Sequence, residues 1–108
     1  MAVSPKPPGF ETSRDPTEDE LKALSTITHQ VLDVLEQCIG DHHVAAVDYR
    51  KPQDGQETIR FRPAFIRTSS AHNIVVWGVP DSDHHWMELR LDRILGVRDT
   101  GDVFEPTW

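Results

Sequence analysis

Four arginine residues have the spacing that most clearly indicates chemistry in this 108-residue chain. Arg60 and Arg62 alternate on one face of an expected strand, directly before Pro63, which interrupts strand pairing. Arg90 lies on the polar face of a later strand, and Arg93 follows in the turn at its end. A guanidinium group binds phosphate or carboxylate through two parallel N–H donors. If the two strands lie side by side, the four side chains therefore surround one site for an anion.

Aromatic side chains extend this hypothesis, and nearby carboxylates supply its alternative. Tyr49 and Trp77 offer ring surfaces on which a base or another planar group stacks. The alternative is that the arginines form an ordinary solvated face or pair with acidic neighbours, which are Asp48, Glu57, Glu88 and Asp92. Strand pairing cannot be read from one sequence, so both interpretations stay open here.

Cysteine and histidine residues do not form a recognisable catalytic or metal-binding pattern. Glycine-rich phosphate loops, nucleophile elbows and paired carboxylates are absent from the sequence. The single cysteine, Cys38, lies in an apolar pattern, where a small buried side chain is expected. Six histidines include the adjacent pairs His42-His43 and His84-His85, whose members point to opposite faces of a strand. We expect no enzymatic activity, cofactor or metal; the alternative is a metal held by one histidine of each pair and an acid.

Charge and hydropathy exclude several classes of protein. The formal net charge of −7 disfavours nonspecific binding to duplex DNA. The longest run of large apolar residues is 74–77, whereas a membrane helix needs roughly 18. The N-terminal residues lack the apolar segment of a signal peptide, and one cysteine permits no internal disulfide. We therefore expect a cytoplasmic protein with no membrane partner.

Residues 1–16 are predicted to be a flexible tail, and residues 17–108 a single domain. The tail holds four of the eight prolines and one aromatic residue, Phe10, so it buries little surface to offset its ordering. The alternative is a tail that docks through Phe10.

One long helix is predicted over residues 17–40. Thr17 and Glu20 have the spacing of a capping box, which marks its start. An apolar stripe continues from Leu21 to Cys38, and Gly40 suits the left-handed position that ends a helix. A stripe of this width needs a surface to cover, either in the same chain or in a second copy.

Residues 44–108 are predicted to form short strands joined by tight turns. Asp54-Gly55 is a strong hairpin signal after the first strand. The alternation of residues 84–91 places Met87, Leu89 and Leu91 inward. Four to five strands at this spacing indicate an α+β fold: one long N-terminal helix packed on a small, strongly bent antiparallel β-sheet or an Sm/SH3-like barrel.

The second part of the chain resembles the WYL domain, a family with an Sm-like, SH3-type β-barrel that is usually fused to a helix-turn-helix in bacterial transcription regulators. The resemblance covers residues 44–104. It rests on Tyr49 at the end of an apolar strand, on Arg60 three residues before Pro63, and above all on the run Leu89-Arg90-Leu91-Asp92-Arg93-Ile94. The aromatics that name the family are replaced by His72-Asn73, and the helix-turn-helix is missing.

The resemblance implies a site for an anionic effector. In WYL domains, arginines at the matching positions help line a site for a nucleotide, a nucleic-acid end or another anion. The implied ligand-binding residues are Tyr49, Arg60, Arg62, Arg90 and Arg93. We therefore expect a small stand-alone regulatory or ligand-binding module that recognises a nucleotide or single-stranded nucleic acid. The alternative is a structural or interaction protein that forms a homodimer, or binds a partner protein, through the helix face from Leu21 to Cys38.

Overall fold

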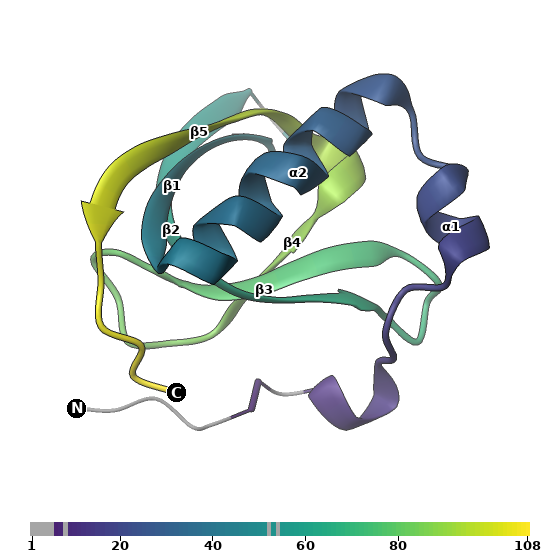
Figure 1. Cartoon of the computed structure of the whole chain (residues 1–108), viewed down its shortest axis with the longest axis horizontal. Helices are drawn as coiled ribbons and strands as arrows, with labels where there is room; N and C mark the ends of the chain where they lie inside the picture. Colours follow the sequence, from purple (N-terminus) through teal and green to yellow (C-terminus); the bar gives the residue numbers. More distant parts are fainter. Residues whose placement is uncertain (1–5, 8, 52, 54) are drawn as a thin grey trace.

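The computed structural model of the chain describes residues 6–7, 9–51, 53 and 55–108 (Figure 1). Its elements in chain order are the 3₁₀ turn η1 (Phe10–Thr12), α1 (Glu18–Lys22), α2 (Thr26–Asp41), β1 (His43–Arg50), β2 (Gln56–Thr68), β3 (Ile74–Pro80), β4 (Met87–Arg90), the 3₁₀ turn η2 (Leu91–Arg93) and β5 (Ile94–Val103). One main helix crosses a curved sheet, so the predicted α+β class is confirmed.

The five strands form one antiparallel sheet in the order β4-β3-β2-β1-β5. Hydrogen-bonded pairing runs from β4 to β5 across the described strands and does not join these two edges. The structure therefore shows a strongly bent sheet, and closure into a barrel stays a prediction. The predicted hairpin after β1 is present, because Arg50 pairs with Gln56 and the Lys51 N–H donates to the Gly55 carbonyl. Residues 52 and 54 of that turn lie outside the described residues.

Strand β2 is long enough to pair with different neighbours along its length. Its first part, residues 56–61, pairs with β1, and residues 61–68 pair with β3. The pairing with β3 is irregular between Pro63 and Phe65, directly after the proline, which has no N–H for the ladder. Gly78 of β3 lies so close to β2 that an added Cβ would meet the Arg62 carbonyl oxygen at 2.4 Å.

The predicted long N-terminal helix is wrong, because the chain forms two helices and the main one lies further along. The capping box is confirmed: the Glu20 N–H donates to Thr17 Oγ1 over 3.1 Å, and Glu20 Oε1 accepts the Thr17 N–H over 2.9 Å. The break follows from a second cap, since Ser25 Oγ accepts the Thr28 N–H and starts α2. Helix α2 also runs past Gly40, and His42 takes the left-handed position instead, with φ 55°.

The apolar face of α2 packs on the inner face of the sheet. Leu35 and Cys38 are completely buried there, in one cluster with Val47, Phe61 and Val76. Leu89 of β4 and Leu91 of η2 complete the cluster, as the alternation of residues 84–91 predicted. Most of the helix stripe is therefore covered by the chain's own sheet.

The outer face of the sheet is covered by aromatic residues and by the two terminal segments. Phe65 of β2 contacts Phe10 and Trp86, with ring centroids 5.2 and 5.8 Å apart. Trp108 then packs on Trp86 at 5.4 Å. Trp77, which alternates with the inward-facing Val76, is nine-tenths buried on this outer side. Within the described residues, no helix has the length and hydropathy needed to span a membrane.

Residues 9–16 lie against the sheet, in the arrangement that the docking alternative describes. Phe10 packs on Phe65, and the backbone of Arg14 pairs with Thr68 at the end of β2. Residues 1–5 and 8 of the predicted tail lie outside the described residues.

Candidate ligand site

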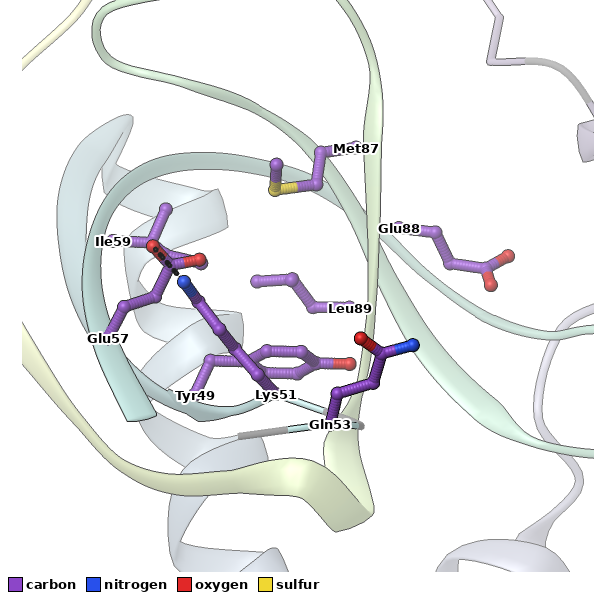
Figure 2. A pocket seen from close by; sticks show the side chains of 8 residues that line it. All are labelled: Tyr49, Lys51, Gln53, Glu57, Ile59, Met87, Glu88 and Leu89. Carbon is purple, nitrogen blue, oxygen red and sulfur yellow. Dashed lines mark ion pairs between the residues drawn. The ribbon is translucent and has the colours of Figure 1, made fainter. Parts of the chain in front are cut away.

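A hollow opens at the end of the sheet where β1 and β2 face β4 (Figure 2). Its volume is about 640 Å³, which falls within the usual range for small-molecule sites. The lining side chains are Tyr49, Lys51, Gln53, Glu57, Ile59, Met87, Glu88 and Leu89. The hollow therefore joins the β1–β2 hairpin to β4, which lies much later in the sequence.

The floor of the hollow is apolar because three strands place alternate side chains inward. Ile59 comes from β2, and Met87 and Leu89 from β4 are two residues apart on the same face. Figure 2 shows the Tyr49 ring lying along one side of this floor. The Arg90 backbone N–H donates to the Tyr49 hydroxyl oxygen over 3.1 Å, which fixes the ring across the gap between β1 and β4. The hydroxyl proton of Tyr49 remains available to donate to a bound group.

The rim of the hollow carries one cation and two acids. Lys51 Nζ lies 3.5 Å from a Glu57 carboxylate oxygen, and both side chains are about half exposed. An exposed pair of this kind contributes at most about 1 kcal/mol, so Lys51 can turn to a ligand at little cost. Glu88 points away from the hollow in Figure 2. The charge that the rim presents to a ligand thus depends mainly on whether Lys51 pairs with Glu57 or with the ligand.

Arg60 and Arg62 lie outside this hollow, near the turn that follows β3. Arg60 donates from Nε to Asp81 over 3.1 Å and from a terminal nitrogen to Asp102 over 2.7 Å. These two hydrogen bonds, that to Asp102 foremost, raise the pKa of Arg60. Arg62 donates to the carbonyl oxygens of Pro80 and Asp83. A second hollow of about 440 Å³ includes Arg60, but the guanidinium group of Arg60 is already paired with Asp81 of the same lining and with Asp102, which leaves less of its charge for an anion.

Arg90 lies at the other end of β3 from Arg60. It pairs with Val75, whereas Arg60 is next to Phe61, the partner of Pro80. Its guanidinium donates twice to Asp92, over 3.0 and 2.6 Å, and this interaction is the main reason why the pKa of Arg90 is raised. The pairing with Asp92 is the one that the alternative interpretation expects.

Of the five residues predicted from sequence, the structure brings Tyr49 and the Arg90 backbone together and places the other arginines elsewhere. Arg93 ends η2 with a half-buried side chain. Trp77, the second predicted stacking surface, is on the outer face of the sheet. A shared arginine site stays a sequence-based prediction. Sequence reasoning missed Lys51 and Ile59, although the inward alternation of Met87 and Leu89 was visible.

Other groups with chemical potential lie away from the hollow. The Cys38 thiol has a pKa raised to about 11, first by its burial and then by the charges of Asp99 and Asp41. Asp41, His43 and Asp99 present ligand atoms within 4.8 Å of one another. The pKa of Asp99 is lowered, first because its carboxylate accepts the Gly101 N–H and then because His43 Nδ1 lies 3.0 Å from it. We read this group as a hydrogen-bonded link between β1 and β5.

Comparison with known proteins supports the fold. Neither a protein-family model nor a curated protein sequence matches the chain. A solved structure of proteasome accessory factor B/C (PafBC) from Arthrobacter aurescens is similar, with a TM-score of 0.68 and 17% sequence identity. The similarity covers 77% of this chain and 13% of that chain. The chain therefore shares its fold with part of PafBC.

Proposed function

We propose that this chain is a non-catalytic, WYL-like regulatory or ligand-binding module whose ligand occupies the hollow between β1, β2 and β4. The observation that carries the proposal is an apolar floor of Ile59, Met87 and Leu89 next to a tyrosine hydroxyl that is held in place. Binding sites of this kind combine apolar surface with a few fixed polar groups. The fold shared with part of PafBC is compatible with this proposal, and the regulatory role itself is inferred from the resemblance of the sequence to the WYL domain.

The expected ligand is a small planar molecule with an anionic group, such as a nucleotide, or the end of a single nucleic-acid strand. Its ring packs on the floor and against Tyr49, which buries apolar surface on both partners. Its anionic group accepts a hydrogen bond from Lys51, which exchanges Glu57 for the ligand. Arg90 contributes indirectly, because its backbone N–H orients Tyr49. The predicted arginine cluster is thus replaced, as the source of positive charge, by Lys51.

Nitrogen–proton NMR of the full chain tests this proposal. The ligands are AMP, cyclic AMP and a four-nucleotide thymidine oligonucleotide, each titrated to 5 mM. We expect saturable shifts at Tyr49, Ile59 and Leu89. Lys51→Gln should weaken binding at least threefold, whereas Lys22→Gln should not, because Lys22 forms a similar exposed pair with Glu18 on α1. Shifts centred on Arg60 would favour the arginine site instead, and no shift with any of the three would reject the proposal.

A second candidate function is a protein interaction through α2 and β5. Most of the helix stripe is buried, but Ile27 and Leu95 are 64% and 49% exposed and line a shallow hollow of about 300 Å³. A homodimer through this patch predicts a doubled sedimentation mass at high micromolar concentration, and Leu95→Glu should return it to that of one chain. A mass of one chain for the unmodified protein would remove the homodimer.

A further inference from the structure

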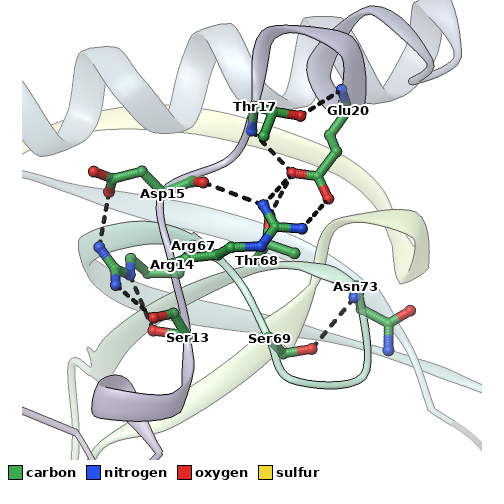
Figure 3. Close-up of polar contacts among 9 residues, drawn as sticks. All are labelled: Ser13, Arg14, Asp15, Thr17, Glu20, Arg67, Thr68, Ser69 and Asn73. Atoms are coloured by element: carbon green, nitrogen blue, oxygen red, sulfur yellow. Dashed lines mark hydrogen bonds and ion pairs between the residues drawn. The ribbon is translucent and has the colours of Figure 1, made fainter.

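Arg67 of β2 is hydrogen-bonded through its guanidinium group to the N-terminal segment (Figure 3). Its Nε donates to Ser13 Oγ over 3.0 Å, one terminal nitrogen to Asp15 over 2.8 Å, and the other to the Ser13 carbonyl over 2.8 Å. All three nitrogens thus bind one short segment of the chain. The Arg67 side chain is only 17% exposed, whereas that of Asp15 is 88% exposed.

The Arg67 guanidinium contacts an aromatic ring as well as the Asp15 carboxylate. Phe10 packs edge-on against Phe65, and the Arg67 guanidinium lies 4.3 Å from the centre of the Phe10 ring. Arg67 therefore contacts both an aromatic ring and an acidic side chain, and the acidic residue follows the aromatic residue by five positions. Cation–π contact and a charge-assisted hydrogen bond together make this arrangement selective for side-chain type.

The backbone of the same segment uses a free stretch of strand edge. Pairing of β2 with β1 extends only to Phe61, so the last part of β2 has β3 on one side alone. Arg14 fills the other side at Thr68: its N–H donates to the Thr68 carbonyl over 3.0 Å, and the Thr68 N–H donates back over 2.7 Å. An extended peptide recognises an exposed strand edge through the same pair of bonds.

We propose that this surface is a binding site for a peptide of a partner protein, in which an aromatic residue at the start of a short 3₁₀ turn precedes an acidic residue by five positions and one backbone pair joins the strand edge between them. Residues 10–15 of the chain show how such a peptide fits, and they occupy the site in cis. The turn of the occupying segment has few anchors on this surface, because Phe10 is its one large apolar contact and the Glu11 and Thr12 side chains are exposed. The segment is also held by the Asp15 carboxylate on Arg67 and by the pairing of Arg14 with Glu20. The site is separate from the hollow near Tyr49 and does not depend on the function proposed there.

The test measures fluorescence polarisation of a labelled peptide with the sequence of residues 6–16, added to the full 108-residue chain. In the double variant F10A/D15N the internal segment loses its ring contact and its carboxylate contact with Arg67, while Arg67, Phe65, Thr68 and the Arg14–Glu20 pair are unchanged. The labelled peptide should bind this variant at least tenfold more tightly than the unmodified chain, whose tethered segment competes at high effective concentration. Adding Arg67→Gln to the double variant should abolish binding.

Matched peptides decide whether recognition follows the proposed chemistry. A peptide with Asp15→Asn should bind the double variant at least fivefold more weakly, whereas one with Glu11→Gln should bind normally, because the exposed Glu11 side chain is outside the Arg67 contacts. NMR signals of Val47 and Val76 report that the core is intact, and D15N alone serves as the released chain if the double variant unfolds. Equal affinity for released and unmodified chains, or no saturable binding by the released chain at 1 mM, would overturn the proposal.

Discussion

The same substitution, glycine to alanine, should have opposite effects on stability at Gly78 and Gly40. At Gly78 an added Cβ would lie 2.4 Å from the Arg62 carbonyl oxygen and 2.6 Å from two carbons of the Phe61 ring. Real Cβ atoms do not approach other atoms so closely. The oxygen belongs to a paired backbone, and Phe61 is completely buried, so neither neighbour moves freely. Strand β3 must therefore shift away from β2.

We expect Gly78→Ala to lower the free energy of unfolding by about 3 kcal/mol, at the upper end of the usual cost of overpacking. For a domain of this size, that change lowers the melting temperature by roughly 12 °C or more. At Gly40, in the last turn of α2, an added Cβ meets no atom within 4 Å beyond its chain neighbours and the helix's own backbone. Gly40→Ala should therefore raise the free energy of unfolding by about 0.5–1 kcal/mol, because alanine loses less backbone entropy in a helix.

Urea denaturation followed by circular dichroism measures both changes on chains that differ from the unmodified protein by one methyl group. The midpoint should move in opposite directions for the two variants, with the slope of the transition unchanged. If Gly78→Ala stays within about 1 kcal/mol of the unmodified protein, the close approach of β3 to β2 is refuted. A destabilised Gly40→Ala variant would contradict the open helix position.

Three further predictions concern single side chains. The pKa of Glu20 is lowered to about 2, chiefly by hydrogen bonds from Arg14. The ionised carboxylate therefore stabilises the fold fully above pH 4.5, and this stabilisation is lost as the pH falls through 2. Acid unfolding of Glu20→Gln should lack this part of the pH dependence. Tyr49→Phe leaves the half-buried Arg90 N–H without its acceptor and should cost about 1 kcal/mol in urea unfolding. Cys38, with a pKa of about 11, should react with a thiol reagent at pH 8 only after the chain unfolds. The reaction is followed by absorbance, and a fast reaction of the native chain would contradict the burial of Cys38.

Helix and strand periodicity carries much of the fold, and its failure at the helix break has a physical reason. The apolar spacing of Leu21, Leu24 and Ile27 continues straight through the break, so the pattern conceals it. Ser25 supplies a cap in the middle of that pattern, and the competition between a side-chain cap and helix continuation is decided by tertiary packing. As a result Ile27, expected on the buried stripe, is 64% exposed.

The candidate site was harder to predict because it depends on which distant residues meet. The alternation of Arg60 and Arg62 gives the face of the strand, but not that Asp81 and Asp102 approach Arg60 from positions 21 and 42 residues away. The hollow likewise combines Tyr49 with Leu89, which only the curvature of the sheet brings together. The local sequence pattern therefore predicted the face of the strand on which each side chain lies. The long-range pairing of the strands determined which residues those side chains meet.

All three tryptophans belong to the outer side of the sheet, and this gives the protein an internal optical probe. Trp86 and Trp108 pack on each other, and Trp77 pairs across the strands with Phe65, which in turn touches Phe10. The intrinsic tryptophan fluorescence should therefore change when either terminal segment loses its contact with the outer face of the sheet. The helix α2 covers the opposite, inner face of the sheet, away from the tryptophans. Tryptophan fluorescence would therefore report on the outer face of this small molecule, whereas circular dichroism would report on the helix.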